Sequence, residues 1–320
     1  MKNKNGVMSV NAIIEKITEQ IQEGIYPGAS LALYRDGQWS EHYLGLADPE
    51  KGEPVVADLV YDLASVSKVV GVATICAFLY AKGELALDRP FKELYPRFAH
   101  EKTTIRELLT HTSGLDPFIP NRDQLDARQL KTALENLQLK EDKSFHYTDV
   151  NFLLLGFWLE DRFRQPLDRL FEELIFTPWK MTETRFGPVE KAVPTVRGVA
   201  SGSVHDPKAR VLGCHAGSAG LFSTVADLER FLEHYLKDDF ARDLSQNFAR
   251  EEGKTRALGW NLEGDWLDHT GYTGTFIMYN RKRQEAVIFL SNRTYEKDER
   301  AQWILDRNSL MDLIKQEFEK

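Results

Sequence analysis

The stretch LVYDLASVSK at residues 59–68, together with the apolar run 69–81 that follows it, decides how this chain is organised. The run ends in a Lys-Gly pair, a helix stop signal, so the pattern predicts an extended segment that leads into a buried helix. Ser65 and Lys68 stand three residues apart where this helix begins, so the lysine ammonium can reach the serine hydroxyl. A hydroxyl becomes nucleophilic when a base takes its proton, and a partly desolvated lysine can be that base. A capping serine beside a surface lysine would give the same pattern. Other segments of the chain are therefore needed to distinguish a catalytic pair from a structural one.

The composition is that of an ordinary globular protein, with 42% hydrophobic and 28% charged residues among 320. This length suits one large domain or two closely packed ones. The formal net charge of −8 argues against nucleic acid as a partner, because phosphate binding requires a basic surface. Cys76 and Cys214 do not indicate a disulfide framework, and no ligand pair with zinc-like spacing accompanies Cys214-His215. We therefore expect no metal and no cofactor.

The N-terminal residues 1–8 contain two lysines but neither an apolar segment nor a small-residue cleavage site, unlike a signal peptide. The longest apolar run, 69–81, is too short to span a bilayer. From these two features we expect a cytoplasmic protein without a membrane segment.

Hydrophobic periodicity predicts strands and helices at both ends of the chain. The strands are expected at 29–34, 38–45, 265–270, 275–280 and 285–291, and the helices at 9–23 and 301–318. The first two strands flank an Asp36-Gly37 turn, which is a hairpin signal. Together these elements predict an α+β fold, in which an antiparallel five-stranded sheet is flanked by the N- and C-terminal helices.

The middle of the chain has a helical pattern. Thr104 and Glu107 form a capping box, and helices are expected at 105–110, 149–162, 166–176 and 224–235. Residues 188–223 are rich in glycine and small side chains, which predicts a long loop that lines a site or is mobile. We therefore expect a discontinuous α/β body (1–80 and 255–320), a mostly helical insert (81–254), and an active site at their interface.

Three further segments carry polar residues suited to catalysis. The sequence YTD at 147–149 precedes an apolar helix and could place a phenol in a cleft. HTG at 269–271 ends a predicted strand, where a glycine lets a ligand approach the backbone. LLTHTSGL at 108–115 ends a short helix. Each segment also has an ordinary structural explanation: an N-cap at Asp149, a turn, and a helix C-cap.

In this order SVSK, YTD and HTG resemble the three motifs of the serine β-lactamase and penicillin-binding-protein superfamily. The similarity points to the branch of class C β-lactamases, D-alanyl-D-alanine carboxypeptidases and β-lactamase-like esterases. LLTHTSGL and AGLFST at 219–224 are characteristic of that branch, and the resemblance covers nearly the whole chain. It implies a β-lactamase/transpeptidase-like fold and a serine hydrolase.

The resemblance also implies a role for each motif residue. Ser65 would be the acylated nucleophile, and Lys68 and Tyr147 would share the role of general base, with Tyr147 passing a proton to the leaving group. Since both bases have reference pKa values near 10, proximity and burial are expected to bring the pKa of one of them toward neutrality. The backbone N–H groups of Ser65 and Tyr272 would form the oxyanion hole. Further residues on the substrate side would be Asp149, His269, Thr270 and Gly271.

Two positions depart from the family pattern. The middle motif usually ends in asparagine, where this chain has Asp149, and the third usually begins with lysine, where it has His269. The pocket thereby loses a permanent cation and an amide donor, which favours neutral esters or amides over substrates held by a carboxylate. A protonated His269 could restore part of the charge.

The expected function is hydrolysis of an ester or amide through an acyl-enzyme on Ser65, of esterase or D-Ala peptidase type. The partner would be a small-molecule or peptide substrate, with β-lactams as further candidate ligands. The alternative is a penicillin-binding or sensing module of the same fold with little or no turnover. Because Ser65, Lys68 and Tyr147 are all present, the enzyme is favoured.

Overall fold

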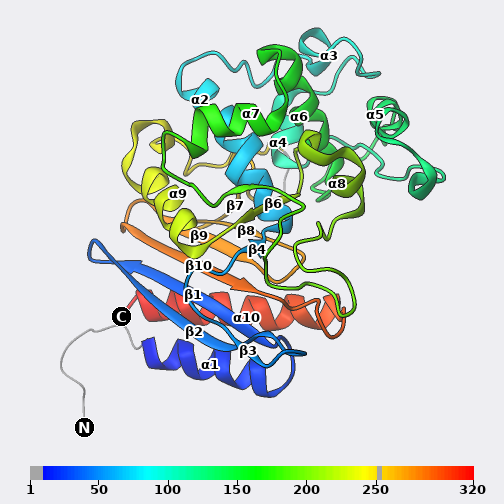
Figure 1. The fold of residues 1–320 in the computed structure, drawn as a ribbon. Coiled ribbons are helices and arrows are strands. Elements are labelled where there is room, and N and C mark those ends of the chain that lie inside the picture. The colour runs from blue at the N-terminus through cyan, green and yellow to red at the C-terminus, as the bar shows by residue number, and fades with distance from the viewer. Residues whose placement is uncertain (1–9, 251–253) are drawn as a thin grey trace.

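The computed structural model describes residues 10–250 and 254–320, so the N-terminal stretch 1–8 interpreted above lies outside the described residues. An antiparallel sheet of seven strands, in the order β3-β2-β1-β10-β9-β8-β7, forms its centre (Figure 1). The strands are β1 Gly28–Arg35, β2 Gln38–Asp48, β3 Glu53–Pro54, β7 Asn261–Glu263, β8 Trp266–Thr270, β9 Phe276–Asn280 and β10 Glu285–Ser291. The predicted fold class is confirmed, with all five predicted strands in the centre of the sheet. The two additional strands, β3 and β7, lie at its edges.

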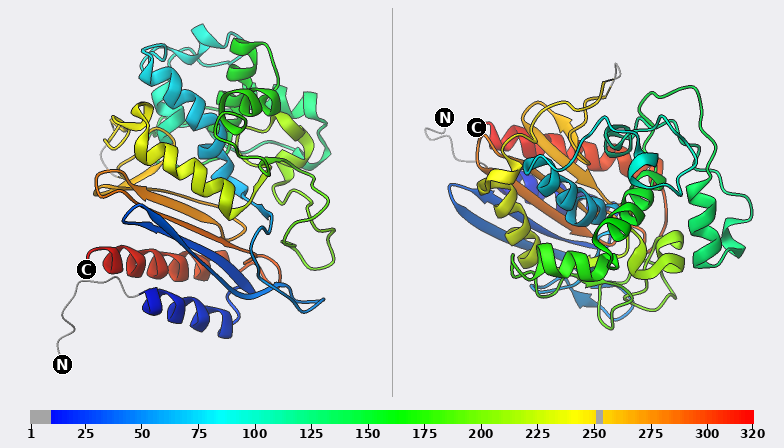
Figure 2. Two further views of the ribbon diagram at one scale, coloured as in Figure 1. Left: turned by 60° about the vertical axis from the view of Figure 1, so that its left-hand side comes forward. Right: turned by 90° about the horizontal axis from the view of Figure 1, so that it is seen from above.

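Two terminal helices, α1 Val10–Gln22 and α10 Arg300–Phe318, cover one face of the sheet, as predicted (Figures 1 and 2). Alternation along β1 explains this packing: Leu31 and Leu33 belong to the apolar cluster under the terminal helices, whereas Ala32 belongs to the cluster on the opposite face. The sheet is therefore buried on both sides.

The opposite face carries the remaining helices. They are α2 Thr74–Ala81, α3 Phe91–Leu94, α4 Ile105–Thr110, α5 Ala127–Glu135, α6 Val150–Phe163, α7 Leu167–Phe171, α8 Pro207–Leu212 and α9 Val225–Lys237. Helix α9 lies in the range predicted for the helical insert, yet it packs directly on β1, β9 and β10 (Figure 2). The division into body and insert stays a prediction.

Residues 188–223 are more ordered than a long loop. They contain α8 and β6 (Leu221–Ser223), and β6 pairs with β4 (Tyr61–Asp62) and β5 (Arg185–Phe186) in a small second sheet. Because β4 shortly precedes Ser65 in the chain, its pairing with β6 fixes the backbone that leads to Ser65.

The apolar segment after Ser65 is not one regular helix. A 3-10 turn, Ala64–Val66, is followed by a π-helical turn, Val69–Ala73, and then by α2. The segment Ala64–Ala81 is 18 residues long and, by length and composition alone, could cross a membrane; 78% of it is buried within the fold, as in the core helix of a soluble protein. A Cβ at Gly71 would lie 2.4 Å from the Phe171 ring, so this turn packs closely against the end of α7.

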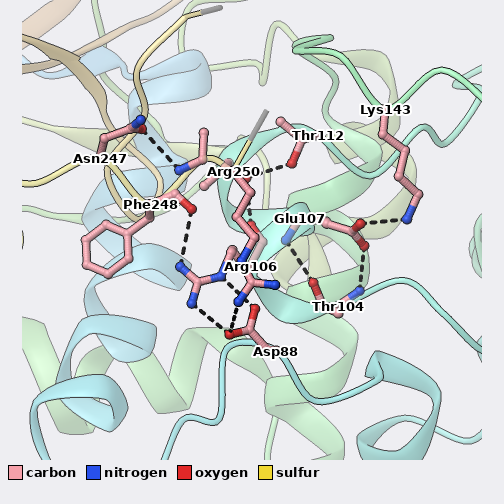
Figure 3. A network of polar contacts seen from close by, with 11 residues as sticks. Asp88, Thr104, Arg106, Glu107, Thr112, Lys143, Asn247, Phe248 and Arg250 are labelled. Carbon is pink, nitrogen blue, oxygen red and sulfur yellow. Dashed lines mark hydrogen bonds and ion pairs between the residues drawn. The ribbon is translucent and has the colours of Figure 1, made fainter. Parts of the chain in front are cut away.

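A polar network anchors α4, which carries the start of LLTHTSGL (Figure 3). Thr104 and Glu107 form the predicted capping box, and Lys143 binds Glu107 at 2.6 Å. Arg106 binds both oxygens of Asp88, at 2.7 and 2.9 Å, and donates to a backbone carbonyl at residue 248. The end of α4 at His111 is thereby fixed relative to its neighbours.

Candidate active site

Ser65 and Lys68 lie in direct contact, as the sequence predicted. Lys68 Nζ donates to Ser65 Oγ at 2.8 Å and to the Ser218 carbonyl at 2.9 Å. The Lys68 side chain is completely buried, so it has no water to solvate its charge. Ser67 Oγ accepts a bond from the Leu221 N–H at 3.1 Å, which ties AGLFST to the same turn.

Asp149 supplies the charge that Lys68 requires. It occupies the N-cap position of α6 but makes no capping hydrogen bond with its side chain. One carboxylate oxygen accepts from Lys68 Nζ at 2.8 Å, and the other lies 3.2 Å from Lys208 Nζ. The predicted N-cap is thus correct in position, while the carboxylate binds two lysines.

This ion pair sets the protonation of both partners. Burial acts to lower the pKa of Lys68, but the Asp149 carboxylate and Tyr147 outweigh it and hold the pKa above the usual lysine value. Burial acts to raise the pKa of Asp149, and Lys68 and Lys208 together hold it well below its usual range. The expectation of a lowered pKa is therefore wrong for Lys68, which is an ammonium in the resting site.

Tyr147 lies above Lys68, with its ring centroid 5.2 Å from Lys68 Nζ. Its ring is 4.6 Å from that of His111, which ends α4 in a left-handed conformation at φ 58°. His111 Nδ1 accepts from the Thr148 N–H at 3.4 Å and faces the Asn151 amide at 3.1 Å. Ser113 binds the same Asn151 side chain at 2.7 Å. LLTHTSGL therefore holds the YTD segment in place.

The third motif is bonded to the residues immediately before Ser65. Thr275 Oγ1 donates to the Leu63 carbonyl at 3.1 Å, and Thr273 Oγ1 donates to the Asp62 carbonyl at 2.9 Å. A Cβ at Gly271 would lie 2.1 Å from Thr275 Oγ1, so this position requires glycine. These contacts bring Tyr272 to the cavity that also contains Ser65. The oxyanion-hole role of their two N–H groups stays a prediction.

His269 is buried and uncharged. It is 2% exposed, and both of its ring nitrogens lack a hydrogen-bond partner among the described residues. Burial, with help from Lys68 and Arg256, lowers its pKa well below the usual histidine value. The hypothesis that a protonated His269 restores a charge is therefore wrong.

Two cavities meet at Ser65, Tyr147 and Tyr272. The larger, of about 720 Å³, also contains Asp149 and Lys208. The smaller, of about 220 Å³, extends past His269 and Thr270 toward α10.

The smaller cavity is strongly cationic. Lys254, Arg300 and Arg307 line it, and no described carboxylate does. Arg307 donates to Thr270 Oγ1 at 3.1 Å, directly beside the unpartnered His269. The expectation that the pocket lacks a permanent cation is therefore wrong, because residues distant in sequence supply the charge.

These cations and Lys208 were not predicted from the sequence. Lys254 and Arg307 belong to segments with no motif, and the fold alone brings them to the third motif. For Lys208 a partial signal exists, since Asp206-Pro207 is an N-cap followed by a proline at the first helical position. Among the described residues, no group of three histidine, cysteine or acidic side chains could hold a metal ion.

Comparison with known proteins identifies the family. The family model described as Beta-lactamase matches residues 13–310, so the chain belongs to the β-lactamase family. The resemblance of the three motifs is thereby confirmed at the level of the family.

Individual relatives agree with this assignment. An Escherichia coli K12 protein, provisionally named a D-alanyl-D-alanine carboxypeptidase, is 28% identical over 90% of this chain and 83% of its own length. A β-lactamase/D-alanine carboxypeptidase structure from Pseudomonas syringae superposes with a TM-score of 0.76 at 20% identity, covering 96% of this chain and 98% of that one. A hydrolase with promiscuous acyltransferase activity gives 0.76 at 19% identity, with 95% and 98% covered. These structures share the fold of this chain.

Proposed function

We propose that the protein is a serine hydrolase that forms an acyl-enzyme on Ser65 with an ester or amide substrate. The observation that carries this proposal is the completely buried Lys68, held 2.8 Å from both Ser65 Oγ and Asp149. A buried ammonium is costly unless it is paired, and its contact with a serine at a cavity suits nucleophilic catalysis.

In the proposed reaction Ser65 Oγ attacks the substrate carbonyl carbon while its proton passes to the phenolate form of Tyr147, or to Lys68 after its ammonium has released a proton. The tetrahedral oxyanion is stabilised by the N–H groups of Ser65 and Tyr272. The same proton then goes to the leaving group as its bond to the carbonyl carbon breaks, and water later cleaves the acyl-enzyme. In the resting site Lys68 donates to Ser65 Oγ, so its positive charge also stabilises the developing alkoxide.

The cationic cavity bears on the class of substrate. With Lys254, Arg300 and Arg307 beside Thr270, a substrate with an anionic group at that end of the scissile bond is favoured over a neutral one. The E. coli relative's name, a carboxypeptidase, describes an enzyme that acts beside a terminal carboxylate. The larger cavity would take the remainder of the substrate. The cytoplasmic location stays a prediction.

A fluorophosphonate probe tests the proposal, because it phosphonylates an activated serine. The wild-type protein should gain the mass of the probe at Ser65, and Ser65→Ala should not. A wild-type protein that is not labelled would refute the proposal. Turnover of p-nitrophenyl esters, nitrocefin and D-Ala-D-Ala peptides then separates an enzyme from a sensing module. Stable acylation by penicillin without turnover of any of these compounds would favour the sensor.

A further inference from the structure

Lys208 is a second lysine on the carboxylate of Asp149. It lies on α8, whose N-cap is Asp206, and the Asp206 side chain accepts from the Ala209 N–H at 2.8 Å. Ala209 is 1% exposed, so this short helix is anchored in the hydrophobic core. The Lys208 side chain is 14% exposed, and its Nζ lies 3.2 Å from Asp149 Oδ2, on the side away from Lys68.

Asp149 carries a negative charge where the family pattern has a neutral amide. With Lys68 as the sole partner, that charge would favour the ammonium form of Lys68. Lys208 adds a positive charge, so that two ammonium groups share one carboxylate. The net charge of Lys68, Lys208 and Asp149 together is then +1. On the Lys68 side this cluster is faced by Ser65, Tyr147, His111, His269 and Arg256. On the Lys208 side Asp116, Arg122, His205 and Asp206 line the same cavity.

We propose that Lys208 is a positioning residue that balances the charge of Asp149, so that the group which accepts the Ser65 proton is deprotonated at a lower pH. The inference rests on the proposed acylation of Ser65. The direction of the expected pH shift is the same whether Lys68 or Tyr147 accepts the proton, because a nearby positive charge lowers the pKa of an ammonium and of a phenol alike. Lys208 therefore acts through Asp149 and needs no contact with the substrate.

A different role for Lys208 predicts a different result. Lys208 also lines the larger cavity, where it could bind an anionic substrate directly. Such a role would change the KM of anionic substrates, would leave the pH profile with an uncharged probe unmoved, and would persist without the Asp149 charge.

The test is the pH dependence of Ser65 labelling by an uncharged fluorophosphonate. The labelling rate constant falls toward low pH as the proton acceptor becomes protonated, and this fall is the acid limb of the profile. In Lys208→Met the acid limb should lie about 1 pH unit higher, so labelling at pH values below it should be about tenfold slower than in the wild type. Lys208→Arg should restore the wild-type profile. Arg210→Met, which removes an exposed cation from the same helix, is the matched control and should leave the profile unchanged.

Combining Lys208→Met with Asp149→Asn completes a double-mutant cycle. In the Asp149→Asn background Lys208 loses the carboxylate that holds its ammonium beside the cluster at 3.2 Å, so Lys208→Met should produce little or no shift there. An unmoved acid limb in Lys208→Met, or an equal shift in the Asp149→Asn background, overturns the inference while Ser65 labelling stands. A wild type that is not labelled at any pH overturns the proposed function and the inference together. Should Lys208→Met fold poorly by circular dichroism, Lys208→Gln carries the same prediction.

Discussion

Replacing Asp149 with asparagine removes one negative charge and keeps the shape of the side chain. The carboxylate lies 2.8 Å from Lys68 Nζ, with Lys68 fully buried and Asp149 24% exposed. An opposite charge at this distance commonly shifts a pKa by about 1–3 units, and one unit corresponds to about 1.4 kcal/mol. The carboxylate favours the ammonium form of Lys68, so its removal lowers the pKa of Lys68.

The acid limb of Ser65 acylation should therefore move to lower pH by about 1–3 units in Asp149→Asn. Below the wild-type limb, labelling should be about 10 to 1,000 times faster. The assay is the second-order rate of labelling by an uncharged fluorophosphonate between pH 5 and 10, with thermal melting to verify folding. Asp161→Asn, at the far end of α6, is the control. A limb that stays in place or moves to higher pH would refute the assignment of Asp149 as the group that holds the proton on the catalytic base.

Three further outcomes are expected. Arg307→Met should raise the KM of a carboxylate-bearing ester about 10- to 100-fold, because it removes a charged hydrogen-bond donor, and should spare a neutral ester; an equal loss for both would contradict the cationic subsite. Gly71→Ala should lower the free energy of unfolding by about 1–3 kcal/mol, because its Cβ would overlap the Phe171 ring; an unchanged melting temperature would contradict this. Burial, followed by the charge of Glu41, raises the pKa of Glu229 to about 8. Its protonated form therefore supports the fold at low pH, and this support is lost as the pH rises toward 8. Glu229→Gln should match the wild type in urea unfolding at pH 5 and exceed it at pH 9; equal stability at both would contradict the burial argument.

Sequence periodicity was sufficient for the central elements of the fold. The five central strands alternate or run apolar over five or more residues, and each ends at a turn signal, so both pattern and length indicate them. The edge strands β3 and β7 have two and three residues, too few for any periodicity. The π-helical turn at Val69–Ala73 was not predictable either, because an apolar run has the same composition in either helical form.

The site was predictable where its residues are close in sequence. Ser65 and Lys68 are fixed relative to one another by one helical turn, and their contact follows from local geometry. The charge balance was not predictable, because Lys208 and Arg307 reach the site through tertiary packing alone. The charge of the pocket was predicted wrongly for the same reason. The prediction used only the residue at position 269, whereas the fold places cations from distant segments beside His269.

The hydrogen bonds from Thr273 and Thr275 to the backbone before Ser65 have a mechanical consequence. They join the nucleophile and Tyr272 into one block built on the sheet, whereas Tyr147 belongs to a second block held by His111 and α6. The Lys68–Asp149 ion pair spans the seam between these blocks. A change of charge at residue 149 would therefore also remove an ion pair that joins these two blocks.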